Sequence, residues 1–219
     1  MHGMPFRPPA ALRVEIPGPA GTLEAVIEDP GPATPTRIGV VCHPHPQFGG
    51  TMDNKVVHTL ARSFQELGLP TVRFNFRGVG KSAGAFAEGV GETDDAVAVI
   101  DWSLGRWPGA ALWLAGFSFG ASIAVRASAQ RPAKVLITVA PAIQRLETGP
   151  TPGPQTRWLL IQGDADELVN HEDVIAWARK RSPPPQVTVL PGVTHYFHGR
   201  LQELKAVVAA FVGREGLED

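Results

Sequence analysis

One serine near the middle of this chain stands between two apolar segments, and this arrangement limits the fold more than any other feature. Residues 111–117 read A-L-W-L-A-G-F, and Ser118 follows them directly. The chain then continues as F-G-A-S-I-A-V-R-A-S, an apolar segment rich in small residues. The pattern predicts a buried strand over 110–117, a sharp turn at Ser118 and a buried helix over about 119–130.

Two glycines complete the pattern G-x-S-x-G around this serine. Gly116 and Gly120 lie two residues before and after Ser118, where side chains would collide if strand and helix come close. Such a turn is a nucleophile elbow, which lifts the serine hydroxyl clear of the chain. A glycine-flanked turn with a solvated serine gives the same five letters. The reading of Ser118 as a nucleophile therefore depends on a base and an acid elsewhere.

The remaining chain alternates strand and helix patterns behind a leading hairpin. Residues 11–16 and 22–28 alternate apolar and polar side chains around P-G-P-A-G, which predicts two antiparallel strands. Further strands are expected at 37–43, 71–76, 110–117, 134–139, 157–161 and 186–190, and helices at 54–67, 92–107, 119–130, 171–180 (N-cap Asn170) and 202–212. We therefore expect an α/β fold with a mostly parallel central sheet, helices on both faces and a leading antiparallel hairpin. We expect a single domain over 1–219, with residues 1–10 as a loose N-terminal segment.

The composition excludes several classes of protein. The 219 residues carry a formal net charge of −1, so no strong field favours nucleic acid or an anionic membrane. The one cysteine, Cys42, excludes an internal disulfide framework and is expected in the core. No apolar stretch is long enough for a signal peptide or a membrane span. We expect a cytoplasmic protein with no nucleic-acid partner and no membrane insertion.

An acid is needed to orient the base that activates a serine, and one loop offers three. The strand R-W-L-L-I-Q ends in G-D-A-D-E-L-V, which contains Asp164, Asp166 and Glu167. A solvated acidic turn before a helix would have the same composition, because carboxylates favour helix N-termini. The position of the loop directly after a buried strand makes all three residues candidates.

A histidine follows the last predicted strand, where the base must lie. The strand Q-V-T-V-L leads into P-G-V-T-H-Y-F-H-G, so His195 and His198 are both candidates. Serine, then acid, then histidine is the chain order of triads built on this kind of sheet. Agreement of the order with both loop positions favours a catalytic reading of Ser118.

Five motifs together resemble the α/β-hydrolase superfamily, and within it a group of small, lidless bacterial hydrolases. The resemblance runs from about Val14 to Val212. Its motifs are H-P-H-P-Q-F-G-G-T-M-D-N-K at 43–55, N-F-R-G-V-G-K-S at 75–82, G-F-S-F-G at 116–120, G-D-A-D-E-L-V at 163–169 and H-Y-F-H-G-R-L at 195–201. The link at 140–156 is short and rich in proline, so it cannot build the helical lid of many hydrolases, and we expect an open site.

The resemblance selects among the candidates. Its pattern G-x-x-D places the acid at Asp166, three residues beyond Gly163, and it places the base at His195, three beyond Gly192. The other candidates then become neighbours: Asp164 and Glu167 beside the acid, and His198 as a residue that packs or orients the histidine loop.

Acyl transfer also needs donors for the oxyanion. One is the backbone N–H of Phe119, the residue after the nucleophile. The second is expected in the loop after residue 43, where Pro44 and Pro46 have no N–H and His45 is the only donor between them. Related hydrolases use this position, so His45 is assigned, with Gln47 as the alternative.

The resemblance implies a serine hydrolase that cleaves a carboxylic ester or thioester of a small molecule through an acyl-enzyme at Ser118. It implies no cofactor and no metal. A peptidase or an acyltransferase using the same triad is the alternative within enzymes, and a non-catalytic binding scaffold is a rival outside them. Monomer and homodimer are both open. The aromatic residues near the motifs are either walls of the acyl pocket or core: Phe48, Phe117, Phe119, Tyr196 and Phe197.

Two further patterns in the sequence resemble sites of other functions, namely a zinc site and a phosphate-binding loop. His43 and His45 could bind zinc, but no third ligand stands at metal spacing, so we expect structural histidines. The segment G-V-G-K-S at 78–82 resembles the end of a phosphate-binding loop. That motif requires glycine at position 75, where the chain has Asn75, so nucleotide binding is the weaker interpretation.

Overall fold

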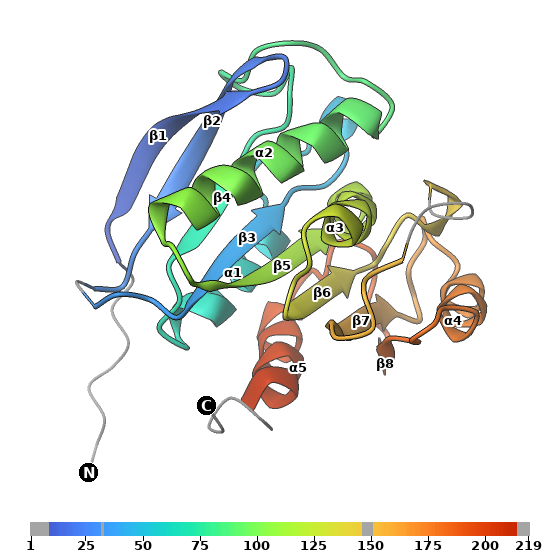
Figure 1. The fold of residues 1–219 in the computed structure, drawn as a ribbon. Helices are drawn as coiled ribbons and strands as arrows, with labels where there is room; N and C mark the ends of the chain where they lie inside the picture. Colours follow the sequence, from blue (N-terminus) through green and yellow to red (C-terminus); the bar gives the residue numbers. More distant parts are fainter. Residues whose placement is uncertain (1–8, 32, 146–150, 214–219) are drawn as a thin grey trace.

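An eight-stranded sheet forms the centre of the protein, here described from a computed structural model that covers residues 9–31, 33–145 and 151–213 (Figure 1). The strands are β1 (Ala11–Gly18), β2 (Gly21–Glu28), β3 (Arg37–Cys42), β4 (Thr71–Phe74), β5 (Ala111–Phe117), β6 (Val135–Val139), β7 (Arg157–Gly163) and β8 (Gln186–Leu190). The helices are α1 (Lys55–Gln65), α2 (Val90–Arg106), α3 (Phe119–Gln130), α4 (His171–Arg179) and α5 (Leu201–Gly213). Every strand and helix expected from the sequence is present. Most of the loose segment expected at 1–10 lies outside the described residues.

The strands follow the order β1-β2-β4-β3-β5-β6-β7-β8 across the sheet. The β1–β2 and β2–β4 pairs are antiparallel, and the other five pairs are parallel. This confirms the mostly parallel sheet with a leading hairpin. Because parallel strands end at the same edge, the loops after β3, β5, β7 and β8 meet there.

Helices cover both faces, as Figure 1 shows for α2 and α3 on one side and α1 and α5 on the other. The central strand β5 alternates between the two layers. Leu112 and Leu114 pack in the core with residues of α2, α3 and α4. Trp113, Ala115 and Phe117 pack with residues of α1 and α5. Burial on both faces explains why β5 reads as a continuous apolar run.

Three smaller expectations concern single segments. Cys42 is fully buried, as expected, and burial raises the pKa of its thiol. Across 9–31, 33–145 and 151–213, no helix has the length and apolar character needed to cross a bilayer. In the link between β6 and β7 the described residues form only the short 3₁₀ turn Ile143–Arg145, and 146–150 lie outside the described residues. No lid helix is present in the described part of this link.

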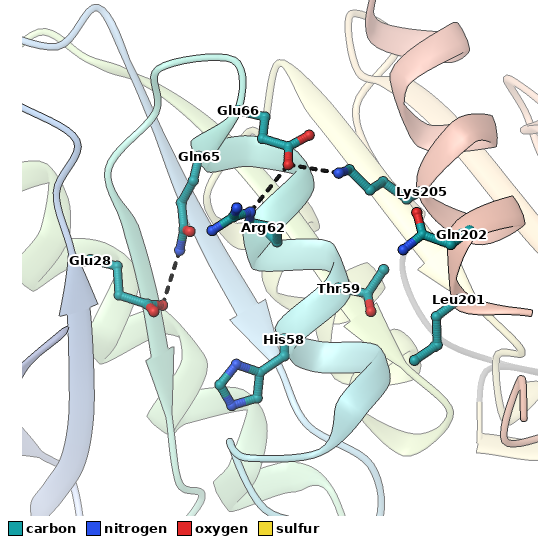
Figure 2. A pocket seen from close by; sticks show the side chains of 9 residues that line it. All are labelled: Glu28, His58, Thr59, Arg62, Gln65, Glu66, Leu201, Gln202 and Lys205. Carbon is teal, nitrogen blue, oxygen red and sulfur yellow. Dashed lines mark hydrogen bonds and ion pairs between the residues drawn. The ribbon is translucent and has the colours of Figure 1, made fainter. Parts of the chain in front are cut away.

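A polar groove of about 510 Å³ lies beside α1 and α5 (Figure 2). Glu66, the residue directly after α1, accepts from Arg62 at 3.1 Å and from Lys205 on α5 at 2.6 Å. Gln65 donates to Glu28 of β2 at 3.0 Å. Burial raises the pKa of Glu66, but the hydrogen bonds and charges of Lys205 and Arg62 lower it by more. The net pKa of Glu66 is therefore below its usual range. These contacts tie the two helices together, and none of the predicted site residues lines the groove.

Candidate active site

Ser118 sits on the expected sharp turn between β5 and α3. Its φ of 54° and ψ of −116° lie outside the conformations that L-residues ordinarily adopt. A Cβ on Gly116 would lie 2.2 Å from the carbonyl oxygen of Gly120, and a Cβ on Gly120 would lie 2.3 Å from that of His43. Both glycines are therefore required by close backbone contacts.

The structure brings three predicted residues together across the carboxyl edge of the sheet. Nε2 of His195 lies 3.1 Å from Oγ of Ser118, and Nδ1 of His195 lies 2.8 Å from Oδ2 of Asp166. The side chain of Asp166 is fully buried and that of His195 is 3% exposed. This is the order of contacts that a nucleophile, a base and an orienting acid require.

Four donors surround the carboxylate of Asp166. Oδ1 accepts the backbone N–H groups of Leu168 and Val169 at 2.9 and 2.8 Å. Oδ2 accepts from Nε2 of Gln162 at 2.8 Å in addition to His195. Burial raises the pKa of Asp166, but the hydrogen bonds from His195, Val169 and Leu168 outweigh it, and the net pKa lies below the usual carboxyl value. The carboxylate is ionised at neutral pH.

The two other acids of this loop hold the histidine loop instead. Oε2 of Glu167 accepts the backbone N–H of His195 at 3.1 Å. Oδ1 of Asp164 accepts the backbone N–H of Gly192 at 2.6 Å. His198 is exposed, and its ring lies 5.9 Å from that of Tyr196. The geometry therefore favours Asp166 and His195 over the alternatives.

The loop after β3 packs against the elbow that carries Ser118. The ring of His45 is 4.9 Å from that of Phe119, the first residue of α3. N–H groups in a first helical turn have no intrahelical acceptor and carry the positive end of the helix dipole. The N–H of Gln47 donates to Nδ1 of His45 at 3.2 Å. That N–H is therefore engaged within the turn, which argues against Gln47 as the oxyanion donor.

Buried polar residues of β4 and the segment after it brace this loop. Met52 donates its N–H to Oδ1 of Asn75 at 2.9 Å and accepts from Nη1 of Arg73 at 2.7 Å. Nε2 of His43 accepts the N–H of Phe76 at 3.0 Å, so Nδ1 carries the proton and donates to Pro44 O. Burial lowers the pKa of His43 to about 4 despite the bond to Pro44. His43 is a neutral structural residue, as expected.

Sequence reasoning missed Gln162 and Arg73. Both are buried polar residues inside mostly apolar strands: the exposed fraction is 0% for Gln162 and 2% for Arg73. A buried amide or guanidinium in such a strand needs hydrogen-bond partners. A polar residue within an apolar strand was therefore the feature of the sequence that could have identified Gln162 and Arg73. The partners themselves come from distant loops, so the sequence alone does not identify them.

The segment 78–82 is tied to the leading hairpin. The hydroxyl of Ser82 donates to Asn75 O and accepts the N–H of Glu24. The backbone N–H of Lys81 donates to Oε2 of Glu24 at 3.0 Å. The next helix, α2, begins only at Val90. A phosphate-binding loop needs its N–H groups and hydroxyl directed at the ligand and a helix starting at once, so this geometry does not favour nucleotide binding.

The aromatic residues near the motifs divide into core and surface. Phe117, Phe119 and Phe197 are buried, whereas Phe48 is 82% exposed and Tyr196 is 44% exposed. The first three are core residues. Only the last two present a large aromatic surface to solvent.

Known proteins resemble this chain over most of its length. The profile of the family described as serine aminopeptidase S33 matches residues 40–158, which is more than half of the chain. The protein RP471 of Rickettsia prowazekii is 32% identical over 205 residues, covering 87% of this chain and 84% of its own.

Solved structures agree with this similarity. XC6422 of Xanthomonas campestris, described as an α/β serine hydrolase without a lid, is 41% identical with a TM-score of 0.87, and the match covers 96% of this chain and 97% of that one. An α/β serine hydrolase homologue from Coxiella burnetii is 44% identical with a TM-score of 0.86, covering 91% and 96%.

Proposed function

This chain belongs to the α/β-hydrolase superfamily, in the family described as serine aminopeptidase S33, and we propose that it cleaves a carboxylic ester or thioester of a small molecule. The observation that carries the proposal is the continuous path of hydrogen bonds from Ser118 through His195 to Asp166. The absence of a second cysteine is consistent with a reducing compartment such as the cytoplasm.

The first half of the proposed reaction acylates Ser118. Nε2 of His195 takes the hydroxyl proton as Oγ attacks the acyl carbonyl carbon. Asp166, held ionised by its donors, stabilises the imidazolium and keeps Nδ1 protonated. The carbonyl oxygen becomes an oxyanion, which the N–H groups of Phe119 and His45 are proposed to bind. His195 then gives its proton to the leaving oxygen or sulfur, and an alcohol or thiol departs.

The second half hydrolyses the acyl-enzyme. His195 takes a proton from water as the water oxygen attacks the acyl carbon, and the same donors bind the second oxyanion. The proton then passes to Oγ of Ser118 as the acyl–oxygen bond breaks. The carboxylic acid is released and the serine is restored. Each step uses only groups of this chain and water.

A substrate screen tests the proposal. We expect the parent protein to hydrolyse esters or thioesters in a series of graded acyl length, and Ser118→Ala to reduce kcat/KM by at least about 10³-fold. Matched amide and peptide substrates and acceptor alcohols in the same screen distinguish a peptidase or an acyltransferase. If no ester or thioester is turned over above the Ser118→Ala rate, the proposal is wrong and a binding scaffold becomes the better account.

A further inference from the structure

The ring of His195 lies between two aromatic side chains, and only one of them is exposed. Phe117 is buried and its ring centroid is 5.2 Å from that of His195. Tyr196 lies on the imidazole edge-on, also with a 5.2 Å centroid separation and an interplanar angle of 89°. Of these two ring neighbours, Tyr196 is therefore the one that a bound molecule can touch.

The histidine loop is built to present this tyrosine. From Val193 to His198 the residues alternate, so that Val193, His195 and Phe197 are buried while Thr194, Tyr196 and His198 are exposed. Phe197 has a φ of 53°, which is costly for a residue with a bulky side chain. The buried rings of His195 and Phe197 fix the loop on both sides of Tyr196. The exposed ring is held in place rather than left on a loose tip.

In the proposed reaction the base and the leaving group must meet. His195 protonates the leaving oxygen or sulfur, so that atom has to come within hydrogen-bond reach of Nε2, about 3 Å. Tyr196 is exposed and its ring contacts this imidazole, so it is within reach of a leaving group that extends from Nε2 toward solvent. Phe48, the other large exposed aromatic ring among the described residues, contacts His45 with a ring-centroid separation of 4.8 Å, next to a proposed oxyanion donor.

We infer that Tyr196 forms a subsite for the leaving group, which selects esters or thioesters of aromatic or extended apolar alcohols and thiols. This inference rests on the proposed function. An aromatic ring on the leaving group stacks on Tyr196 and removes apolar surface from water during acylation. The preference belongs to the acylation step, because the acyl-enzyme no longer contains the leaving group.

Two esters with the same acyl group test the subsite. The acyl group is the one hydrolysed fastest by the parent protein in the screen, and the leaving groups are ethanol and 2-phenylethanol, both primary alcohols. The quantity measured is the ratio of kcat/KM for the phenylethyl ester to that for the ethyl ester. We expect Tyr196→Ala to lower this ratio about fivefold to tenfold. Tyr196→Phe keeps the ring and should keep the ratio within about twofold.

Leu12→Ala is the matched control, because Leu12 is 54% exposed on β1, at the opposite edge of the sheet from the histidine loop after β8. It should leave the ratio unchanged. A Tyr196→Ala protein whose ratio equals that of the parent overturns the subsite while leaving the hydrolase in place. Equal losses on both esters overturn it too, since they indicate a role in holding His195. Absence of Ser118-dependent turnover with every acyl group overturns the subsite and the proposed function together.

Discussion

Gln162 and His195 share one oxygen of Asp166, and the reactivity proposed for the site depends on this sharing. Nε2 of Gln162 also lies 3.3 Å from Gly163 O and 3.4 Å from Val169 O, so three acceptors fix the orientation of the amide. A donor on a carboxylate oxygen reduces the negative charge that the oxygen offers to a second donor. Gln162 therefore limits how strongly Asp166 holds the imidazolium of His195.

Replacing this donor should move the pH–rate profile. Gln162→Met keeps a similar side-chain volume but donates no hydrogen bond to Asp166. Oδ2 of Asp166 then stabilises the imidazolium form of His195 more strongly. We expect the acid limb of the kcat/KM profile to move to higher pH, with a larger loss of rate at pH 6 than at pH 8. Unfolding in urea, measured at both pH values, separates a loss of folding from this effect. A profile that keeps its acid limb contradicts the assigned role.

His43 should make the stability of the fold depend on pH in a separate range. The pKa of His43 is about 4 in the folded protein and 6.5 in the unfolded chain. Between these two pH values, therefore, only the unfolded state binds the proton. Stability is therefore full above pH 6.5 and falls as the pH drops toward 4. The lowered pKa of Asp166 affects stability at a lower pH than His43 does. Its contribution to the unfolding free energy is lost only as the pH falls below the ordinary carboxyl pKa.

His43→Gln removes the titrating group and offers an acceptor for the N–H of Phe76. We expect the parent to lose about 2–3 kcal/mol of unfolding free energy between pH 7 and pH 4.5 through this histidine. The variant, less stable at pH 7, should show a correspondingly flatter dependence. Urea titrations at a series of pH values measure this difference. Parallel curves for the two proteins would mean that His43 is not the group responsible.

At the scale of elements, the elbow holds because β3, β5 and α3 approach at backbone distance. Gly116 on β5 faces the first turn of α3, and Gly120 in that turn faces the end of β3 at Cys42 and His43. The N–H of Ser118 donates to Val139 O of β6 at 2.8 Å. Three strands and one helix therefore fix the backbone of the proposed nucleophile.

Gly120→Ala tests this close approach. Its Cβ would lie 2.3 and 2.4 Å from two carbonyl oxygens of β3 and the residue after it, so backbone must shift. We expect a loss of about 1–3 kcal/mol of unfolding free energy, together with most of the hydrolytic activity, because the shift moves Ser118. Gly105→Ala on α2 is the control, since its Cβ would meet nothing within 4 Å and alanine favours helix. Equal stability of the two variants would refute the close-packing argument.

The sequence predicted elements well where one physical cause dominates. The apolar runs of β3, β5 and β7 and the periodic face of α1 follow from burial alone, and each lies within a few residues of its expected range. Asn170 caps α4 as expected, through its side-chain oxygen and the N–H of Asp173. Long-range polar contacts were not predictable. The bonds of Arg73 to the loop at Met52 and of Gln162 to Asp166 join segments whose proximity is set by the whole fold.

At the scale of the whole molecule, the sheet order decides where the chemistry can occur. Four loops at one sheet edge carry His45, Ser118, Asp166 and His195, although His45 and His195 are 150 residues apart in the chain. The strands that precede them, β3, β5, β7 and β8, are parallel, so all four loops leave the sheet on the same side. The short link after β6 is consistent with a site open to solvent. Such a site suits a substrate that is held by its scissile group and by the exposed rim.

Mass spectrometry of the intact protein after treatment with a fluorophosphonate tests the central claim most directly. The probe reacts with a serine only where a base removes its proton and donors bind the oxyanion. We predict one adduct per chain, located at Ser118 by peptide mapping, and its loss in Ser118→Ala and His195→Ala. Folded parent protein that gains no adduct, or gains it at another residue, would contradict the account.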